Sequence, residues 1–131
     1  MKLITYEKIP PTIIQDEKHL EQLITSAFTD AKEDNVLNVI FLVAENENEM
    51  GIVVGGDETV LSFNYGSLEA PYYASKGPSS EIQPVMTCYA FLLHHTEFPR
   101  KYVIPFNAGL QATYEFFKTN ELPKCVEWME V

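Results

Sequence analysis

The residues best suited to chemistry in this sequence are two adjacent histidines, His94 and His95, which lie close to Cys88 and Glu97. Histidine and cysteine bind zinc when several of them converge on one point. The surrounding residues predict a strand, however, and successive side chains of a strand point to opposite faces. Two neighbouring histidines therefore do not easily share one ion, and a strand-end pair that makes ordinary hydrogen bonds is the simpler interpretation. We predict neither a metal site nor a cofactor.

The two cysteines are weak candidates for a nucleophile. A catalytic thiol needs a nearby base and surroundings that favour the thiolate. Cys88 and Cys125 both fall in predicted strands and have apolar neighbours, so we expect two buried, unreactive thiols in a reducing compartment. No phosphate-loop pattern follows Gly51, Gly55 or Gly56, which we interpret as hairpin glycines. We predict that the protein is not an enzyme.

Acidic residues occur in two predicted turns, and two adjacent tyrosines follow Pro71 at the start of the next predicted strand. A carboxylate pair that performs acid–base catalysis needs surroundings that separate its two pKa values, whereas these turns are expected to be wet. Two interpretations stay open for the acidic residues: a solvated edge, or a surface that occupies the cationic groove of a partner. One tyrosine of an alternating strand faces outward and could anchor an interface. The predicted binding residues are Glu47, Glu49, Asp57, Glu58, Tyr72 and Tyr73.

The charge balance limits the partners. Nineteen Asp and Glu residues against nine Lys and Arg residues give a net charge of −10 and a pI of about 4.6. Nucleic acids and anionic membranes attract clustered cations, so both are disfavoured as partners. A basic protein fits best, although acidity that serves only solubility explains the charge equally well. Since we find no secretion signal and no membrane-spanning run, we expect a cytoplasmic protein.

Two helices are predicted. The first has an apolar stripe and carries Asp16 and Glu17 at its start, where carboxylates meet the positive end of the helix dipole. The polar run 29–35 is expected to be its exit loop. The second helix is expected to begin near Pro105 or Asn107 and to end at Asn120. The stripe of the first helix consists of Leu20, Leu23, Ile24, Ala27 and Phe28.

Runs of apolar and alternating residues predict the strands. The runs at 36–44 and 85–93 are apolar on both sides, which favours positions inside the sheet. Short turns join the first three strands, so their pairing should be antiparallel. We predict an α+β fold with a single domain over residues 1–131, a mainly antiparallel sheet of about five to six strands and two main helices. The strands are expected at 36–44, 51–54, 59–65, 72–77, 85–93 and 125–131.

Several segments of the carboxy-terminal third match one family. They are EFP at 97–99, IP at 104–105, FFKT at 116–119 and ELPKCVEWMEV at 121–131, and YASKG at 73–77 is also similar. In these segments, and in the order of its elements, the chain resembles the first-numbered immunity-protein family of bacterial polymorphic toxin systems, which is associated chiefly with deaminase toxins. Asn120 stands where that family often has glycine, and both residues tolerate a positive φ angle.

The resemblance implies a cytosolic antitoxin that binds a cognate toxin and blocks its active site. The toxin would be a basic protein, such as a deaminase or a nuclease. Two alternatives stay open. One is a small metal-dependent enzyme that uses His94 or His95. The other is an acidic homo-oligomeric interaction module, for example a homodimer that pairs through an exposed sheet edge.

Overall fold

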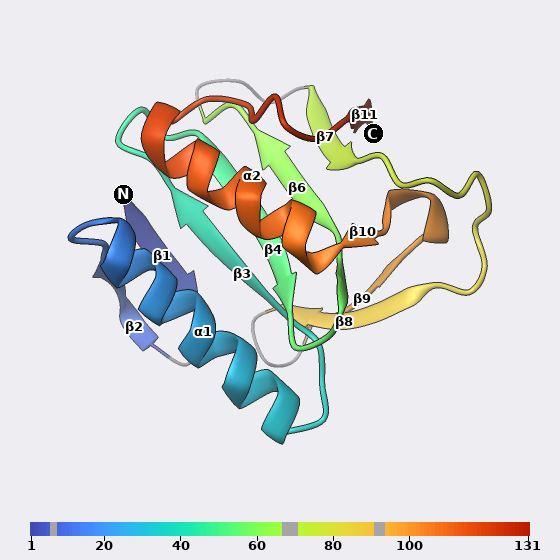
Figure 1. Ribbon diagram of the computed structural model, residues 1–131, viewed down its shortest axis with the longest axis horizontal. Coiled ribbons are helices and arrows are strands. Elements are labelled where there is room, and N and C mark those ends of the chain that lie inside the picture. The colour runs from blue at the N-terminus through green and yellow to red at the C-terminus, as the bar shows by residue number, and fades with distance from the viewer. Residues whose placement is uncertain (6–7, 67–70, 91–93) are drawn as a thin grey trace.

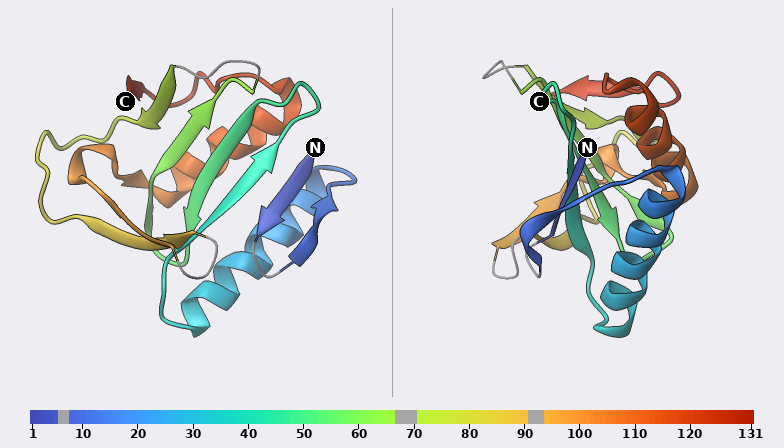
Figure 2. Two further views of the ribbon diagram at one scale, coloured as in Figure 1. Left: turned by 180° about the vertical axis from the view of Figure 1, so that it is seen from behind. Right: turned by 90° about the vertical axis from the view of Figure 1, so that its left-hand side faces the viewer.

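Two helices lie on one face of a large twisted sheet in the computed structural model of the chain (Figures 1 and 2). The structure describes residues 1–131 except 6–7, 67–70 and 91–93. The helices are α1 (Glu17–Glu33) and α2 (Phe106–Thr119). The short 3-10 helix η1 (Arg100–Tyr102) precedes α2.

Helix α1 begins where the sequence predicts it and ends later. Asp16 is the N-cap, and its Oδ1 accepts the N–H of His19 at 2.8 Å. The predicted loop at 29–35 is wrong, because the helix continues to Glu33. Ala31 is fully buried, so it extends the apolar stripe of Leu20 and Ile24 by a further turn.

Helix α2 is fixed at both ends by the backbone. The N–H of Phe106 donates to the carbonyl oxygen of Asp57 at 2.8 Å, which ties the helix start to the turn after β4. The predicted end is confirmed: Asn120 has φ 59°, and its N–H donates to the carbonyl oxygen of Phe116 at 2.7 Å. Asparagine is one of the few residues other than glycine that adopts this left-handed conformation readily.

The main sheet follows the order β11-β7-β6-β4-β3-β1-β2, and all neighbours on this path are antiparallel. Strand β8 leaves the path: it pairs with β3 in parallel and with β9 antiparallel. Strands β5 and β10 form a second, two-stranded sheet. The strands are β1 (Lys2–Thr5), β2 (Lys8–Ile13), β3 (Asn38–Val43), β4 (Glu49–Val54), β5 (Glu58–Thr59), β6 (Leu61–Asn64), β7 (Tyr72–Ser75), β8 (Met86–Ala90), β9 (His94–Phe98), β10 (Ile104–Pro105) and β11 (Trp128–Glu130).

The predicted α+β class is confirmed, as is the antiparallel pairing of the first three predicted strands, but the number of strands is wrong. The main sheet has nine strands within the described residues, not five to six. The prolines of β2 were interpreted only as barriers to a helix; β2 lies at a sheet edge, where a missing N–H leaves no partner unsatisfied. The predicted strand 59–65 splits into β5 and β6, and the last strand is three residues long. Part of the predicted strand 85–93 lies outside the described residues, and β9 follows as a strand that was not predicted.

The hydrophobic core has two parts, one on each face of the sheet. On the helix side, Ile40, Leu42 and Phe63 pack with the apolar sides of α1 and α2. On the other side, Val39 and Val53 pack with Met86 and Cys88 of β8 and with Val103, which follows η1. Strand β3 therefore has core on both faces, as its apolar run predicts.

The two faces of the sheet are covered unequally. Both helices lie on the same side, and the β8–β9 hairpin lies on the other side at one end of the sheet (Figure 2, right). Over the rest of that side, no helix of the described chain covers the strands. We call this side the open face.

Replacing Asp16 by alanine should lower the free energy of unfolding by about 1 kcal/mol, because the His19 N–H loses its acceptor. Denaturation followed by circular dichroism measures the change. Asp30→Ala, an exposed site on the same helix, is the matched control and should change stability by less than about 0.5 kcal/mol. Equal losses in the two variants would contradict a capping role for Asp16.

Candidate functional site

One row of side chains crosses the open face from the edge strand β2 to β7. Residues paired across neighbouring strands point to the same side of a sheet. The pairings Lys2–Val43, Val43–Glu49, Glu49–Asn64 and Asn64–Tyr72 therefore place these side chains side by side. Over five gaps between strands, at about 4.8 Å each, the row extends on the order of 24 Å. From β2 to β7 the row consists of Ile13, Lys2, Val43, Glu49, Asn64 and Tyr72.

A second row lies beside the first and is mostly apolar. Gly51 is at its centre, where an added Cβ would come within 2.5 Å of the Ser62 hydroxyl and 3.1 Å of the Phe41 ring. The absence of a side chain at Gly51 therefore allows Phe41 to lie close against β4. The row consists of Ile4, Phe41, Gly51, Ser62, Ala74 and Met129.

Large hydrophobic side chains are exposed on and beside these rows. Ile13 is 62% exposed, Tyr72 is 48% exposed and the carboxy-terminal Val131 is 58% exposed. The Val131 N–H donates to the carbonyl oxygen of Tyr72 at 2.8 Å, which holds the end of the chain against β7. Tyr72 and Val131 thus form an exposed apolar pair at one end of the first row, and exposed apolar groups of this kind are a common mark of a protein interface.

Glu49 is the one carboxylate within the first row. Its side chain is half-buried, and burial raises the pKa of the carboxyl above its usual value of 4.5. Its direct neighbours in the row are Val43 and Asn64, and no described residue forms an ion pair with it. The charged form is thus partly desolvated and uncompensated in the free protein.

A buried asparagine holds the turn beside this row. Asn48 Nδ2 donates to the carbonyl oxygen of Asn120 at 2.8 Å, and its Oδ1 accepts the N–H of Gly66 at 3.2 Å. A Cβ on Gly66 would overlap the Glu47 carbonyl oxygen, so only glycine permits this approach. The β3–β4 turn, the residue after Tyr65 and the end of α2 are thereby fixed together. The sequence analysis missed Asn48, because nothing in an acidic turn distinguishes it from its neighbours.

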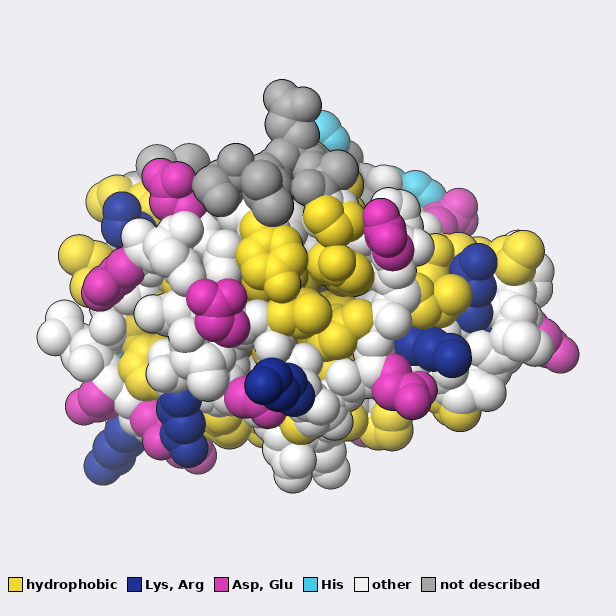
Figure 3. Space-filling model, turned by 90° about the horizontal axis from the view of Figure 1, so that it is seen from above, with side chains coloured by type: hydrophobic (Ala, Val, Ile, Leu, Met, Phe, Trp, Pro, Cys, Tyr) yellow, Lys and Arg dark blue, Asp and Glu magenta, His cyan; other side chains and the backbone are white. Residues whose placement is uncertain are grey.

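This end of the molecule is also partly apolar. Figure 3 looks down on it and shows hydrophobic side chains gathered near the centre, with acidic side chains at several places around them. An aromatic cluster lies under the end of the sheet, where the ring centroids of Tyr65 and Tyr73 are 6.4 Å apart and those of Phe63 and Trp128 are 6.1 Å apart.

Three of the six predicted binding residues lie close together. Glu49 and Tyr72 are in the first row of the open face, and the exposed Glu47 is two residues before Glu49 in the adjoining turn. Tyr73 points to the opposite face and packs with Tyr65. The expectation that one tyrosine faces inward and the other outward is therefore confirmed.

The other two predicted residues lie at the far end of β4. Asp57 is exposed in the turn after this strand, where its carbonyl receives the N–H of Phe106. Glu58 accepts two hydrogen bonds from Arg100 Nη1, at 2.9 and 3.0 Å. About six residues of extended strand, on the order of 20 Å, separate this end from Glu49. The structure does not bring the six residues into one cluster.

The histidines and cysteines form no catalytic arrangement in the described part of the chain. His94 and His95 are exposed on β9, and no group of three potential metal ligands occurs among the described residues. Burial raises the pKa of the Cys88 thiol to about 12. The expectation of two buried thiols is wrong for Cys125, which is exposed because it lies before the short final strand. Partial burial and the neighbouring Glu115 nevertheless raise the pKa of Cys125.

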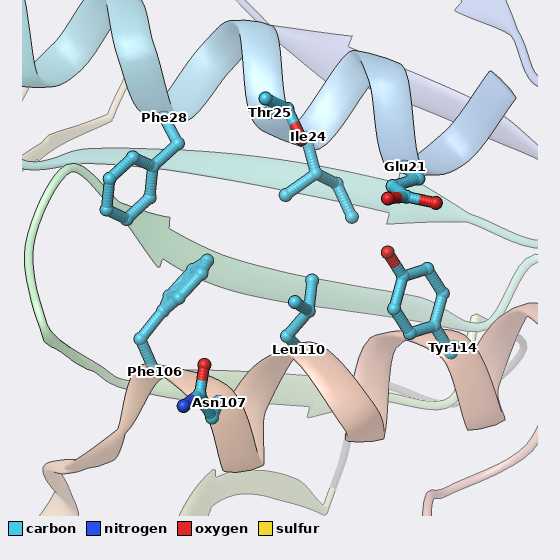
Figure 4. A pocket seen from close by; sticks show the side chains of 8 residues that line it. All are labelled: Glu21, Ile24, Thr25, Phe28, Phe106, Asn107, Leu110 and Tyr114. Atoms are coloured by element: carbon cyan, nitrogen blue, oxygen red, sulfur yellow. The ribbon is translucent and has the colours of Figure 1, made fainter. Parts of the chain in front are cut away.

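A groove of about 300 Å³ lies between α1 and α2, on the opposite side from the open face. At one end the rings of Phe28 and Phe106 are 4.9 Å apart, and at the other end Glu21 and the Tyr114 hydroxyl point toward each other (Figure 4). Burial, Glu21 and Glu17 raise the pKa of Tyr114. The phenol therefore stays neutral at physiological pH, and the lining offers no nucleophile with an adjacent base.

Comparison with known protein families gives a match over nearly the whole chain. The model of the family described as immunity protein Imm1 matches residues 11–130. The chain belongs to the Imm1 family of immunity proteins. This match confirms the resemblance to an immunity-protein family and extends it well beyond the carboxy-terminal third. No curated protein gives a significant match to the sequence.

Membership of this family changes the interpretation of the surfaces. An immunity protein acts against a toxin, so the partner of this chain is a toxin. An exposed surface suited to a protein is then of more interest than an enclosed site. Within the described residues, neither α1 nor α2 combines the length and hydrophobicity that a membrane-spanning helix requires.

Asn48→Ala should lower the free energy of unfolding by about 2 kcal/mol, because the buried Asn48 amide is lost and the Gly66 N–H and the Asn120 carbonyl each lose a partner. Urea denaturation measures the loss. Asn46→Ala is the matched control: its exposed amide bonds the same carbonyl at 3.1 Å, and its removal should cost less than about 1 kcal/mol. A loss in Asn48→Ala no larger than in the control would contradict this role of Asn48.

Iodoacetamide should label one cysteine of the native protein, Cys125, because Cys88 is buried. The reaction at pH 8 should be slower than with free cysteine, since a raised pKa leaves less thiolate. Peptide mass spectrometry identifies the labelled residue. Cys88 should react only after denaturation, and its rapid labelling in the native protein would contradict the packing around β8.

Proposed function

We propose that the chain is a cytoplasmic antitoxin whose open face binds the cognate toxin and covers the toxin's active site. It would act by occupying a surface and would carry out no reaction of its own. The observation that carries this proposal is the open face itself, a row of exposed and half-buried side chains in a chain of the Imm1 family.

The composition of the open face supports its role as the interface. The centre of a protein interface typically contains apolar and aromatic side chains within a polar rim. Met129, Val43 and the Phe41 ring supply apolar contact, and Tyr72 supplies an exposed aromatic side chain. Glu47 stands at the margin, where a charged group affects association rate more than final affinity.

The charge supports a cationic toxin. A deaminase or nuclease that acts on nucleic acid needs a cationic surface to bind phosphates. A chain with a net charge of −10 attracts such a surface over several ångströms in solution. An inhibitor seated there also excludes the substrate, so binding alone accounts for neutralisation.

Co-expression tests the proposal directly. The toxin domain encoded beside this gene should stop growth when it is expressed alone in a bacterial host. Co-expression of this chain should restore growth, and the two purified proteins should form a stable complex with a single stoichiometry. A chain that binds this toxin without protecting the host, or that does not bind it, would contradict the proposal.

Two charge reversals at opposite ends of β4 test the location of the interface. Glu47→Lys, beside the open face, should slow association with the toxin by about fivefold at low salt and should weaken the salt dependence of the rate. Asp57→Lys is the matched control, because Asp57 is equally acidic, exposed and located in a turn. Stopped-flow measurements give both rates. A larger effect at Asp57 than at Glu47 would place the interface at the other end of the strand.

A further inference from the structure

We propose that Glu49, Asn64 and Tyr72 form a seat for one arginine side chain of the toxin. The inference rests on the proposed function and names the chemistry of the contact at the centre of the open face. The three residues are consecutive in the first row, on the adjacent strands β4, β6 and β7.

The spacing of the three side chains suits a planar cation. Paired residues on neighbouring antiparallel strands have Cβ atoms about 4.5–5.5 Å apart. A carboxylate, an amide and a phenol thus stand at consecutive positions on one side of the sheet. The carboxylate can accept two N–H groups of a guanidinium, the amide oxygen can accept a third, and the tyrosine ring offers a face for stacking.

Among the described residues, no group occupies the polar atoms of these three side chains. None of them makes a side-chain hydrogen bond or ion pair with the described residues. Glu58 provides the contrast, because its carboxylate already receives Arg100 from its own chain. Glu49, in contrast, forms no ion pair within the described part of the chain, although it is the more buried of the two carboxylates.

When a partner covers Glu49, the carboxylate charge must either be paired with a cation or be removed by protonation. Burying a carboxylate without a counter-ion is costly, and the group then takes up a proton instead. An arginine supplies the missing charge together with directed donors, whereas lysine offers a compact point charge with no planar face for Tyr72. Charge complementarity with a chain of net charge −10 favours the same choice.

Other charged groups near the seat determine the controls. Lys2 lies two strands from Glu49 in the same row, beyond Val43. Glu47 is in the adjoining turn, and the carboxy-terminal residue Val131 lies beside Tyr72. These neighbours are the same in the wild-type chain and in Glu49→Gln, so the difference between the two chains gives the contribution of Glu49.

The sign of that difference tests the proposal. A bound guanidinium stabilises the carboxylate, so the Glu49 pKa falls on binding and a proton is released. The affinity contributed by Glu49 should then rise as pH increases through the range of its free pKa, and level off above it. A partner without a cation would raise the pKa further, and the affinity would then fall as pH increases above the free pKa.

The experiment uses the cognate toxin with substitutions that disable catalysis outside the interface, and titrates it at several values between about pH 4 and pH 8, a range that begins below the usual pKa of a glutamate. Glu49→Gln should raise Kd by roughly 30-fold at neutral pH and abolish the rising component. Glu47→Gln, an exposed carboxylate two residues away, is the matched control and should raise Kd by less than about threefold. Urea denaturation of both variants verifies that they fold as the wild-type chain does.

Substitution of each interface arginine and lysine of the toxin identifies the cation. One arginine, changed to alanine, should weaken binding to the wild-type chain but hardly change binding to Glu49→Gln. Coupling to a lysine, coupling to no residue, or an affinity that falls with pH would overturn the inference while the antitoxin function stands. A wild-type chain that does not bind the toxin would overturn both.

Discussion

The packing of α1 and α2 on the same side of the β3–β4 pair is the constraint on which the rest of the structure depends. Strands β3 and β4 are joined over six consecutive residue pairs, and their helix-facing side chains are almost completely buried. Because both helices use that side, the described segments that pack on the other side are the β8–β9 hairpin and the residues around η1. The open face exists because both helices pack on the opposite side of the sheet, and its apolar residues are therefore not covered by the described helices.

Electrostatics gives this face its chemical character. Most acidic side chains of the chain are exposed and can be solvated independently of any partner. Glu49 is different, because it stands half-buried between Val43 and Asn64 and has lost part of its hydration. Glu58, which pairs with Arg100, shows how a carboxylate of the same chain behaves when an internal cation is present. The charge of Glu58 is already neutralised by a residue of the same chain, whereas a cation of a partner could neutralise the charge of Glu49.

Local patterns predicted the local features of this fold and failed where distant segments meet. The start of α1 at Asp16 and the end of α2 at Asn120 follow from capping preferences of single residues. The pairing of β1 with the far end of β3, and the parallel contact of β8 with β3, follow from tertiary packing that no short window contains. Local sequence patterns also predicted only part of the candidate site. Glu49 and Tyr72 were expected from their chemistry, whereas Asn64 and Asn48 matter through partners brought to them by the fold.

The alternation of side chains along β4, β6 and β7 separates residues needed for packing of the core from residues that face outward. Alternate positions of β4 point to opposite sides of the sheet: Met50 and Ile52 pack in the core under the helices, while Glu49 and the buried Gly51 point to the open face. If the open face is the interface, point substitutions at its exposed positions, such as Tyr72, would alter recognition with little damage to folding. A single-residue insertion within one of these strands would turn its core side chains outward and its outward side chains into the core. We therefore expect substitutions to be tolerated at outward strand positions and insertions to be tolerated only in the turns.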